Sequence, residues 1–154
     1  MPYARKLQAY IQEQQLAAEH LCFTESCHSV AEAAAAVGAS SDEFVKNICL
    51  IGSDEKLVVA IVRGKDRVDR KKAAQVLGIK SMRMATADEI LERTNFPCGG
   101  TPSFGFKAIF LMDKRIFTLT EVYTGGGSEN SLVKAAPQVL LDANQAEICD
   151  IIKI

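Results

Sequence analysis

Residues 44–51 have the sequence FVKNICLI, which predicts a β-strand because the segment is mostly apolar and contains several β-branched residues. Turn-forming residues flank it at 40–42 and 52–54. Because side chains of a strand alternate between its two faces, Lys46 is expected to share an apolar row with Phe44 and Ile48. An ammonium group in such a row needs a partner or water, since burying it unpaired is costly. Position alone slightly favours a lysine that reaches solvent from the strand end, and the alternative is a binding site.

The composition predicts one globular domain spanning residues 1–154. The chain has 154 residues, of which 48% are hydrophobic, so it is long enough to bury a sizeable core. The formal net charge of −1 argues against a general nucleic-acid coating protein, although it is compatible with a local basic patch. No uncharged apolar run reaches the about 18 residues that a membrane span needs, and no apolar signal core follows the N-terminus. A cytoplasmic protein is therefore expected, with no membrane partner.

The five cysteines and two histidines predict neither disulfides nor a metal centre. The cysteines are odd in number and scattered, without the spacing of a disulfide framework, so reduced thiols are expected. The residues that could be considered as metal ligands are His20, Cys22, Cys27 and His28. They contain no C-x-x-C pair and have no distal partner pair, so no metal site is predicted. A Cys–His nucleophile is also disfavoured, because Cys49 should face away from Lys46 and Cys98 has no assigned base.

Helical and strand patterns are interspersed along the chain. Ser29, Asp69 and Thr86 are predicted to cap the starts of helices, and glycines follow two of these helices as left-handed stops. Helices are expected over residues 3–20, 30–37, 70–77, 87–93 and 137–141, and strands over 20–23, 44–51, 57–62, 79–84, 107–112, 121–124 and 148–152. Several strands are joined by short links, the first of which predicts an antiparallel hairpin. The sequence therefore indicates an α/β (α+β) fold with helices packed on a mixed, mainly antiparallel sheet.

A long loop without periodicity is predicted for residues 94–106, and it contains the run GGTP at 99–102. Glycines let a backbone approach a ligand closely and expose its N–H groups as donors. The prolines on both sides, Pro97 and Pro102, would stiffen the loop, as a preorganised donor site requires. A tight structural loop is an equally good interpretation, although loops of this length in compact domains are often functional.

A second glycine-rich loop, GGGS at residues 125–128, could cradle a phosphate or an adenosine. It lacks the Lys-Ser/Thr ending of a P-loop and does not clearly open a helix, which disfavours nucleotide triphosphate hydrolysis. From its spacing alone, a flexible turn is the favoured interpretation.

Residues 63–83 form a basic segment within a nearly neutral chain. Its cations are Arg63, Lys65, Arg67, Arg70, Lys71, Lys72, Lys80 and Arg83. Its only acids are Asp66 and Asp69. A solvated helix face is the usual reason for such a run, and the alternative is a surface that binds a phosphate backbone.

The order and spacing of these motifs resemble the YbaK family, also called the prolyl-tRNA-synthetase-associated editing domain. The resemblance covers residues 29–154, and no single motif in it is specific. Its motifs are SVAEAAAAVG at 29–38, FVK at 44–46, RG at 63–64, RVD at 67–69, GGTPSFG at 99–105 and GGG at 125–127.

The resemblance implies a compact α/β editing domain with a mixed, partly barrel-like sheet and flanking helices. It implies hydrolysis of the ester of a misacylated tRNA, most simply a tRNA for proline that carries alanine or cysteine. Members are free-standing proteins or domains inserted in a synthetase, and a chain of this length resembles the free-standing kind. Such editing is needed because a synthetase pocket rejects smaller or near-isosteric amino acids only weakly.

The resemblance also implies roles for residues, in a reaction that uses water and no cofactor. Lys46 would pair with a phosphate or carbonyl oxygen of the substrate, and the glycine loop would supply backbone donors to the developing oxyanion. The catalytic set implied in this way is Lys46, Gly99, Gly100 and Thr101. The substrate-binding set is Pro102, Gly126, Gly127, Ser128, Arg63 and Arg67. No Ser, Cys or His nucleophile is expected, and Asn47 stands where many members have threonine after the lysine.

Three hypotheses about function follow. The first is a deacylase that acts in trans on the 3′ end of a misacylated tRNA, with a synthetase as a further candidate partner. The second is a module of the same fold that binds tRNA or a synthetase without catalysis. The third is a small-molecule hydrolase unrelated to tRNA. The basic segment favours a nucleic-acid ligand over the third hypothesis, and Lys46 in its apolar row favours a site over an inert scaffold.

Overall fold

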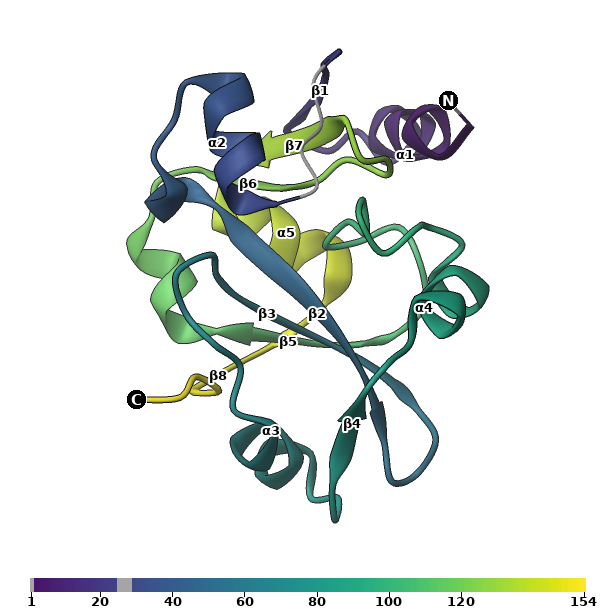
Figure 1. The fold of residues 1–154 in the computed structure, drawn as a ribbon, viewed down its shortest axis with the longest axis vertical. Helices are drawn as coiled ribbons and strands as arrows, with labels where there is room; N and C mark the ends of the chain where they lie inside the picture. The colour runs from purple at the N-terminus through teal and green to yellow at the C-terminus, as the bar shows by residue number, and fades with distance from the viewer. Residues whose placement is uncertain (1, 25–28) are drawn as a thin grey trace.

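The computed structural model describes residues 2–24 and 29–154, which form two β-sheets with helices packed around them (Figure 1). The helices are α1 (Pro2–Glu13), α2 (Val30–Val37), α3 (Arg70–Leu77), α4 (Ala87–Thr94) and α5 (Pro137–Asn144), with 3-10 turns η1 (Ser41–Glu43) and η2 (Lys114–Thr118). The strands are β1 (Ala18–Cys22), β2 (Val45–Gly52), β3 (Leu57–Arg63), β4 (Met82–Met84), β5 (Ile109–Asp113), β6 (Val122–Gly125), β7 (Ser131–Ala135) and β8 (Glu147–Cys149). Within the described ranges, no helix is both long and apolar enough to cross a bilayer.

The larger sheet has the strand order β4-β2-β3-β5-β8, and the smaller sheet has the order β1-β7-β6. The predicted hairpin is confirmed as the antiparallel pair β2–β3, in which Lys46 lies opposite Val62. The pairs β2–β4, β1–β7 and β6–β7 are antiparallel, whereas β3–β5 and β5–β8 are parallel. The mixed, mainly antiparallel α/β fold is therefore confirmed. The partly barrel-like sheet takes the form of two sheets that do not close.

Two hydrophobic cores lie on opposite faces of the β2–β3 hairpin. One face, with Val45 and Cys49, packs against α1, α5 and the small sheet. The other face, with Ile48 and Leu50, packs against Ala73 and neighbouring residues of α3. Residues 58–62 of β3 are completely buried, which is the burial expected of a strand covered on both faces.

The predicted helix ends are confirmed at the capping residues. The Ser29 hydroxyl accepts from the Glu32 N–H at 3.1 Å, and Asp69 accepts from the N–H groups that open α3. Thr86 forms the predicted capping box with Glu89. Gly38 and Gly78 both adopt φ 66°, the left-handed conformation that glycine adopts without steric cost.

Several predicted boundaries were wrong, and one strand was missed. The first helix ends at Glu13 rather than near residue 20, because Gln15 turns at φ 54° and β1 then pairs with β7. Strand β4 begins only at Met82, where pairing with β2 begins, and β8 ends at Cys149. Strand β7 was not predicted, because a segment of five residues carries only a weak alternation of apolar and polar side chains. It is stabilised as the central strand of the small sheet.

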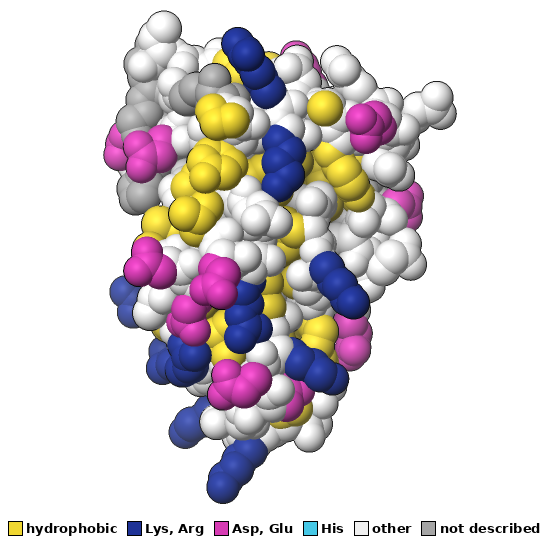
Figure 2. All heavy atoms as spheres, turned by 90° about the vertical axis from the view of Figure 1, so that its right-hand side faces the viewer, with side chains coloured by type: hydrophobic (Ala, Val, Ile, Leu, Met, Phe, Trp, Pro, Cys, Tyr) yellow, Lys and Arg dark blue, Asp and Glu magenta, His cyan; other side chains and the backbone are white. Residues whose placement is uncertain are grey.

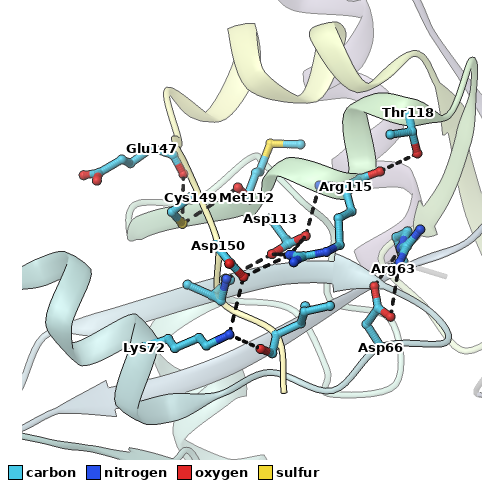
Figure 3. A network of polar contacts seen from close by, with 12 residues as sticks. Arg63, Asp66, Lys72, Met112, Asp113, Arg115, Thr118, Glu147, Cys149 and Asp150 are labelled. Carbon is cyan, nitrogen blue, oxygen red and sulfur yellow. Dashed lines mark hydrogen bonds and ion pairs between the residues drawn. The ribbon is translucent and has the colours of Figure 1, made fainter. Parts of the chain in front are cut away.

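The C-terminal segment is anchored by a buried carboxylate at the end of β5 (Figure 3). Asp113 is fully buried, and it accepts from the Ile151 N–H at 3.0 Å and from the Arg115 guanidinium at 3.1 Å. Arg115 also donates to Asp150 at 3.0 Å. Lys72 of α3 lies 3.6 Å from the same Asp150 carboxylate and donates to the Ile152 carbonyl at 2.8 Å. Asp113 thus fixes the chain end against β5 and η2, and Lys72 joins the same segment to α3.

We expect Asp113→Ala to lower the free energy of unfolding by about 3 kcal/mol, because it leaves the buried Ile151 N–H without an acceptor and Arg115 without its buried partner. Urea unfolding measures the loss. Asp150→Ala is the matched control: it removes an acid that binds the same Arg115, but this side chain is 42% exposed, so little change is expected. Equal effects of the two changes would contradict the anchoring role of Asp113.

Candidate functional site

A cleft of about 250 Å³ opens where the first half of β2 meets α2, β6 and the 97–104 loop. Its polar side is lined by Lys46 and Asn47 and by residues 99–101. The four residues predicted as a catalytic set therefore lie together, although Lys46 is more than fifty positions from the other three in the chain. The long glycine loop and the lysine strand form two walls of the same cavity.

Lys46 is half-buried at this cleft. Its ammonium donates to the Asp66 main-chain carbonyl at 2.5 Å, in the loop between β3 and α3. The Asp66 carboxylate is in turn bound by Arg63, with Nε 2.7 Å from Oδ2. Burial lowers the pKa of Lys46 below 10.5, the nearby charge of Arg67 lowers it further, and Asp66 opposes both. The amine is therefore held by the protein at the wall of a cleft, rather than extending freely into solvent.

The two glycine-rich loops pack against each other, backbone to backbone. The Gly127 N–H donates to the Gly100 carbonyl at 2.8 Å. A Cβ atom on Gly100 would collide with the main chain of Ser128, and one on Gly125 would collide with the Thr101 carbonyl. These are main-chain atoms that cannot rotate away, so the contact requires glycine at both positions.

The backbone donors of the first loop differ in availability. The Gly100 N–H donates to the Pro97 carbonyl at 3.0 Å, and the Thr101 hydroxyl donates to the same oxygen at 3.0 Å. Among the residues that the structure describes, the N–H groups of Gly99 and Thr101 have no acceptor. Both residues line the cleft. Gly99 and Thr101 can therefore donate to a ligand, whereas Gly100 serves the packing of the loops.

Asn47 holds this loop in place through a buried polar network. Its Nδ2 donates to the Thr101 carbonyl at 3.0 Å and to the Thr124 hydroxyl at 2.8 Å, and its Oδ1 accepts from Ser103 at 2.7 Å. The Ser103 and Thr124 hydroxyls are themselves 2.7 Å apart, and both residues are buried. Sequence reasoning missed these three residues. The available signal was that each of these polar residues stands in a segment expected to be partly buried. Buried polar groups are nearly always hydrogen-bonded, so the three could have been expected to bond to one another.

The opposite side of the cleft is apolar. Phe44 and Tyr123 stack with ring centroids 4.9 Å apart and an interplanar angle of 23°. Ala33 of α2 and Leu132 of β7 pack against this pair. A ligand in the cleft would thus contact a cation and backbone donors on one side and a small apolar wall on the other, an arrangement typical of small-molecule sites.

The six residues predicted to bind substrate lie around the cleft rather than in its lining, which includes Gly125 instead. They are Pro102, Gly126, Gly127, Ser128, Arg63 and Arg67. Gly126 is engaged within the protein, since its N–H donates to Ser131 and its carbonyl lies 2.8 Å from His20 Nε2. The Ser128 hydroxyl lies 2.6 Å from that of Ser131. Pro102 is buried, Arg63 is paired with Asp66, and Arg67 is exposed beside Lys46. Roles of these six in binding substrate stay predictions.

The candidate metal ligands Cys27 and His28 lie outside the described residues. Within residues 2–24 and 29–154, no three His, Cys, Asp or Glu side chains are grouped so that they could hold a metal ion. The four described cysteines are free thiols. Burial raises the pKa of the Cys49 thiol to about 12, so this thiol stays protonated and unreactive at neutral pH.

Residues 24–143 match the aminoacyl-tRNA editing domain, and the chain belongs to that family of proteins. The expected resemblance is thereby confirmed.

Individual relatives are similar over different shares of their length. The chain is 23% identical over 128 residues to EbsC of Enterococcus faecalis, a candidate Cys-tRNA(Pro)/Cys-tRNA(Cys) deacylase, and the match covers 82% of the chain and 76% of EbsC. It is 30% identical over 104 residues to the proline–tRNA ligase of Nitratidesulfovibrio vulgaris, covering 68% of the chain but 17% of the ligase. The crystal structure of a candidate trans-editing enzyme for prolyl-tRNA synthetase superposes with a TM-score of 0.90 at 30% identity, covering 100% of the chain and 99% of that protein.

We expect Asn47→Ala to lower the free energy of unfolding by about 2 kcal/mol, because it removes three hydrogen bonds from a buried network. Amide hydrogen exchange in the 97–104 loop should also accelerate, since the Thr101 carbonyl loses its tether. Gln138→Ala is the control: it removes an amide that makes one exposed side-chain hydrogen bond, to Asp142. If loop exchange is unchanged in Asn47→Ala, the network does not position the loop.

Proposed function

We propose that this protein is an aminoacyl-tRNA deacylase that hydrolyses the ester of a misacylated tRNA in trans. The observation that carries the proposal is that Lys46, Gly99 and Thr101 line one cleft beside an apolar wall, and that the N–H groups of Gly99 and Thr101 have no acceptor among the described residues. Membership of the editing-domain family supports the same reaction. We further propose that residues 1–154 act as a single editing domain in the cytoplasm, with an aminoacyl-tRNA synthetase as a candidate partner.

The proposed substrate is a tRNA for proline that carries alanine or cysteine. Similarity to EbsC and to bacterial proline–tRNA ligases supports this choice of tRNA. The apolar wall formed by Phe44, Tyr123 and Ala33 would face the amino-acid side chain, and a cleft of about 250 Å³ suits a small one. A synthetase rejects small apolar competitors weakly, which is the reason for a second hydrolytic site.

The proposed mechanism is electrostatic and positional. The described residues that line the cleft include no carboxylate or histidine, so the proposed mechanism assigns the activation of water to no carboxylate or histidine of that lining. Thr101 and Gly99 N–H groups would stabilise the oxyanion that develops when water attacks the ester carbon. Lys46 has three N–H donors, so it can keep its bond to the Asp66 carbonyl while it donates to a substrate oxygen. The terminal adenosine hydroxyl of the tRNA would help to orient the water.

We expect Lys46→Met to lower the rate of deacylation about 100-fold or more, which is the usual effect of removing one donor to an oxyanion. The assay uses a panel that includes alanyl- and cysteinyl-tRNA for proline. Thermal stability at neutral pH should not fall, because the substitution removes a cation that burial disfavours. Lys65→Met is the matched control, since Lys65 is exposed and its one ion pair within the described residues is with Asp42, at 3.8 Å.

Equal hydrolysis by wild type and Lys46→Met would contradict the catalytic role of Lys46. No hydrolysis of any panel member, together with measurable tRNA binding, would favour the binding module instead.

The pH dependence provides a separate test of the Lys46 ammonium. Activity, corrected for spontaneous ester hydrolysis, should fall as pH rises through the lowered pKa of Lys46, below 10.5. Asp66 raises that pKa, so Asp66→Asn should move the fall to lower pH. Because the folded state holds this proton less tightly than the unfolded state, the contribution of Lys46 to the free energy of unfolding rises with pH between the two pKa values. A descending limb that is the same in both proteins would show that Lys46 does not set it.

A further inference from the structure

A second hollow, of about 510 Å³, lies between α3 and β4, away from the cleft. Three cations line it, Arg70, Lys71 and Lys80. Its apolar lining comes from Ala74, Ile79 and Met82. No acidic residue is part of the described lining, so a ligand would meet an uncompensated positive surface. We call this hollow the α3–β4 groove.

The cations of the basic segment divide into paired and unpaired groups. The pairs are Arg63 with Asp66, Lys65 with Asp42, Lys72 with Asp150, and Arg83 with Glu89. In the described part of the chain, the cations of this segment without an ion-pair partner are Arg67, Arg70, Lys71 and Lys80. Three of these four line the α3–β4 groove, and the fourth lies beside Lys46. Most of the unpaired charge of this segment is therefore collected in the α3–β4 groove.

The cleft is lined from both faces of β2, and one of these faces packs on α3, which borders the α3–β4 groove. Ile48 lines the cleft, and it packs in the same core as Ala73 of α3. Strand β2 connects the two sites, because Lys46 lies near its start and Gly52, at its end, pairs with Met82 of the groove. Six residues of strand at about 3.3 Å each separate the two sites by about 20 Å. Figure 2 shows Lys and Arg side chains projecting from the lower end of the molecule, where α3 and β4 lie in Figure 1.

We propose that the α3–β4 groove binds the sugar–phosphate backbone of the tRNA acceptor stem while the aminoacylated 3′ end occupies the cleft. Unpaired Lys and Arg side chains on one face are the electrostatic footprint of such a contact. Arg67 would contact phosphates between the two sites. The inference rests on the proposed function, and it assigns the part of the protein that recognises the tRNA body. It also accounts for a nearly neutral protein that binds RNA, since the attraction is local.

The test compares two double variants in which lysine becomes glutamine, which keeps the aliphatic stem. The groove variant is K71Q with K80Q. The control variant is K56Q with K107Q, two exposed lysines that line a different hollow of about 580 Å³, which also contains Glu55. Binding of deacylated tRNA is measured by fluorescence anisotropy over a range of salt concentrations, and circular dichroism checks the folding of each protein.

The groove variant should bind tRNA about tenfold more weakly at low salt, and the slope of log K against log salt should fall by about 2, because each of the two lysines would neutralise one phosphate. The control variant should keep the affinity and slope of the wild type. Equal losses of affinity in the two variants would overturn the proposal, because they would reflect net charge alone. Unchanged affinity of the groove variant would overturn it too.

Deacylation separates this inference from the proposed function. The groove variant should lose activity on full-length aminoacyl-tRNA but keep the wild-type rate on an aminoacylated CCA trinucleotide, which is too short to reach the groove. Equal losses of activity on both substrates would overturn the groove as a stem-binding surface. If neither substrate is hydrolysed by any variant and tRNA binding still depends on the groove, the proposed function fails and the groove stands. A groove variant that lost affinity for polyglutamate, and none for tRNA, would identify an acidic protein as the partner instead.

Discussion

The contact between the two glycine loops is the constraint on which the candidate site depends. The Gly100 carbonyl accepts from Gly127, and the main chains lie so close that Gly100 and Gly125 leave no room for a Cβ atom. This contact uses the N–H group of Gly127, while the Gly100 N–H closes a turn onto Pro97. Among the described residues, the loop amides without an internal acceptor are those of Gly99 and Thr101, and both residues line the cleft. Backbone packing therefore decides which amides support the loop and which can meet a ligand.

Asn47, the centre of a buried polar network, and Lys46, a partly desolvated cation, are adjacent on β2 and have opposite effects on the stability of the fold. Asn47 lowers the energy of the fold by satisfying Ser103, Thr124 and the Thr101 carbonyl. Lys46 raises it, because burial disfavours its charge and one carbonyl bond offsets only part of that cost. Both residues line the cleft, but successive side chains of a strand face opposite sides, so Asn47 bonds to the 97–104 loop and Lys46 to the Asp66 carbonyl. A cation kept where burial disfavours it is typical of a functional site.

Strand β2 also sets the distance between the cleft and the α3–β4 groove. Its first residues line the cleft, its middle packs on α3, and its end pairs with β4 beside the α3–β4 groove. Helix α3 is held in turn by Lys72, which reaches the C-terminal segment that Asp113 anchors (Figure 3). The position of the groove relative to the cleft thus depends on a rigid strand and on a buried carboxylate. Cations that form ion pairs in this region stabilise the fold, and the unpaired cations are the ones proposed to bind the tRNA backbone.

Local chemistry in the sequence determined the helix starts at Ser29, Asp69 and Thr86, the β2–β3 hairpin and the placing of Lys46 on a strand, because caps, turns and alternation act over a few residues. The family followed from the order of short motifs. Tertiary structure alone decided that the loops at 99–101 and 125–127 touch, that Asn47 joins them, and that Asp66 holds Lys46, since these contacts join segments 20 to 77 positions apart. It also decided the extent of β1 and the existence of β7, whose pairing supplies the stability that their own short sequences lack.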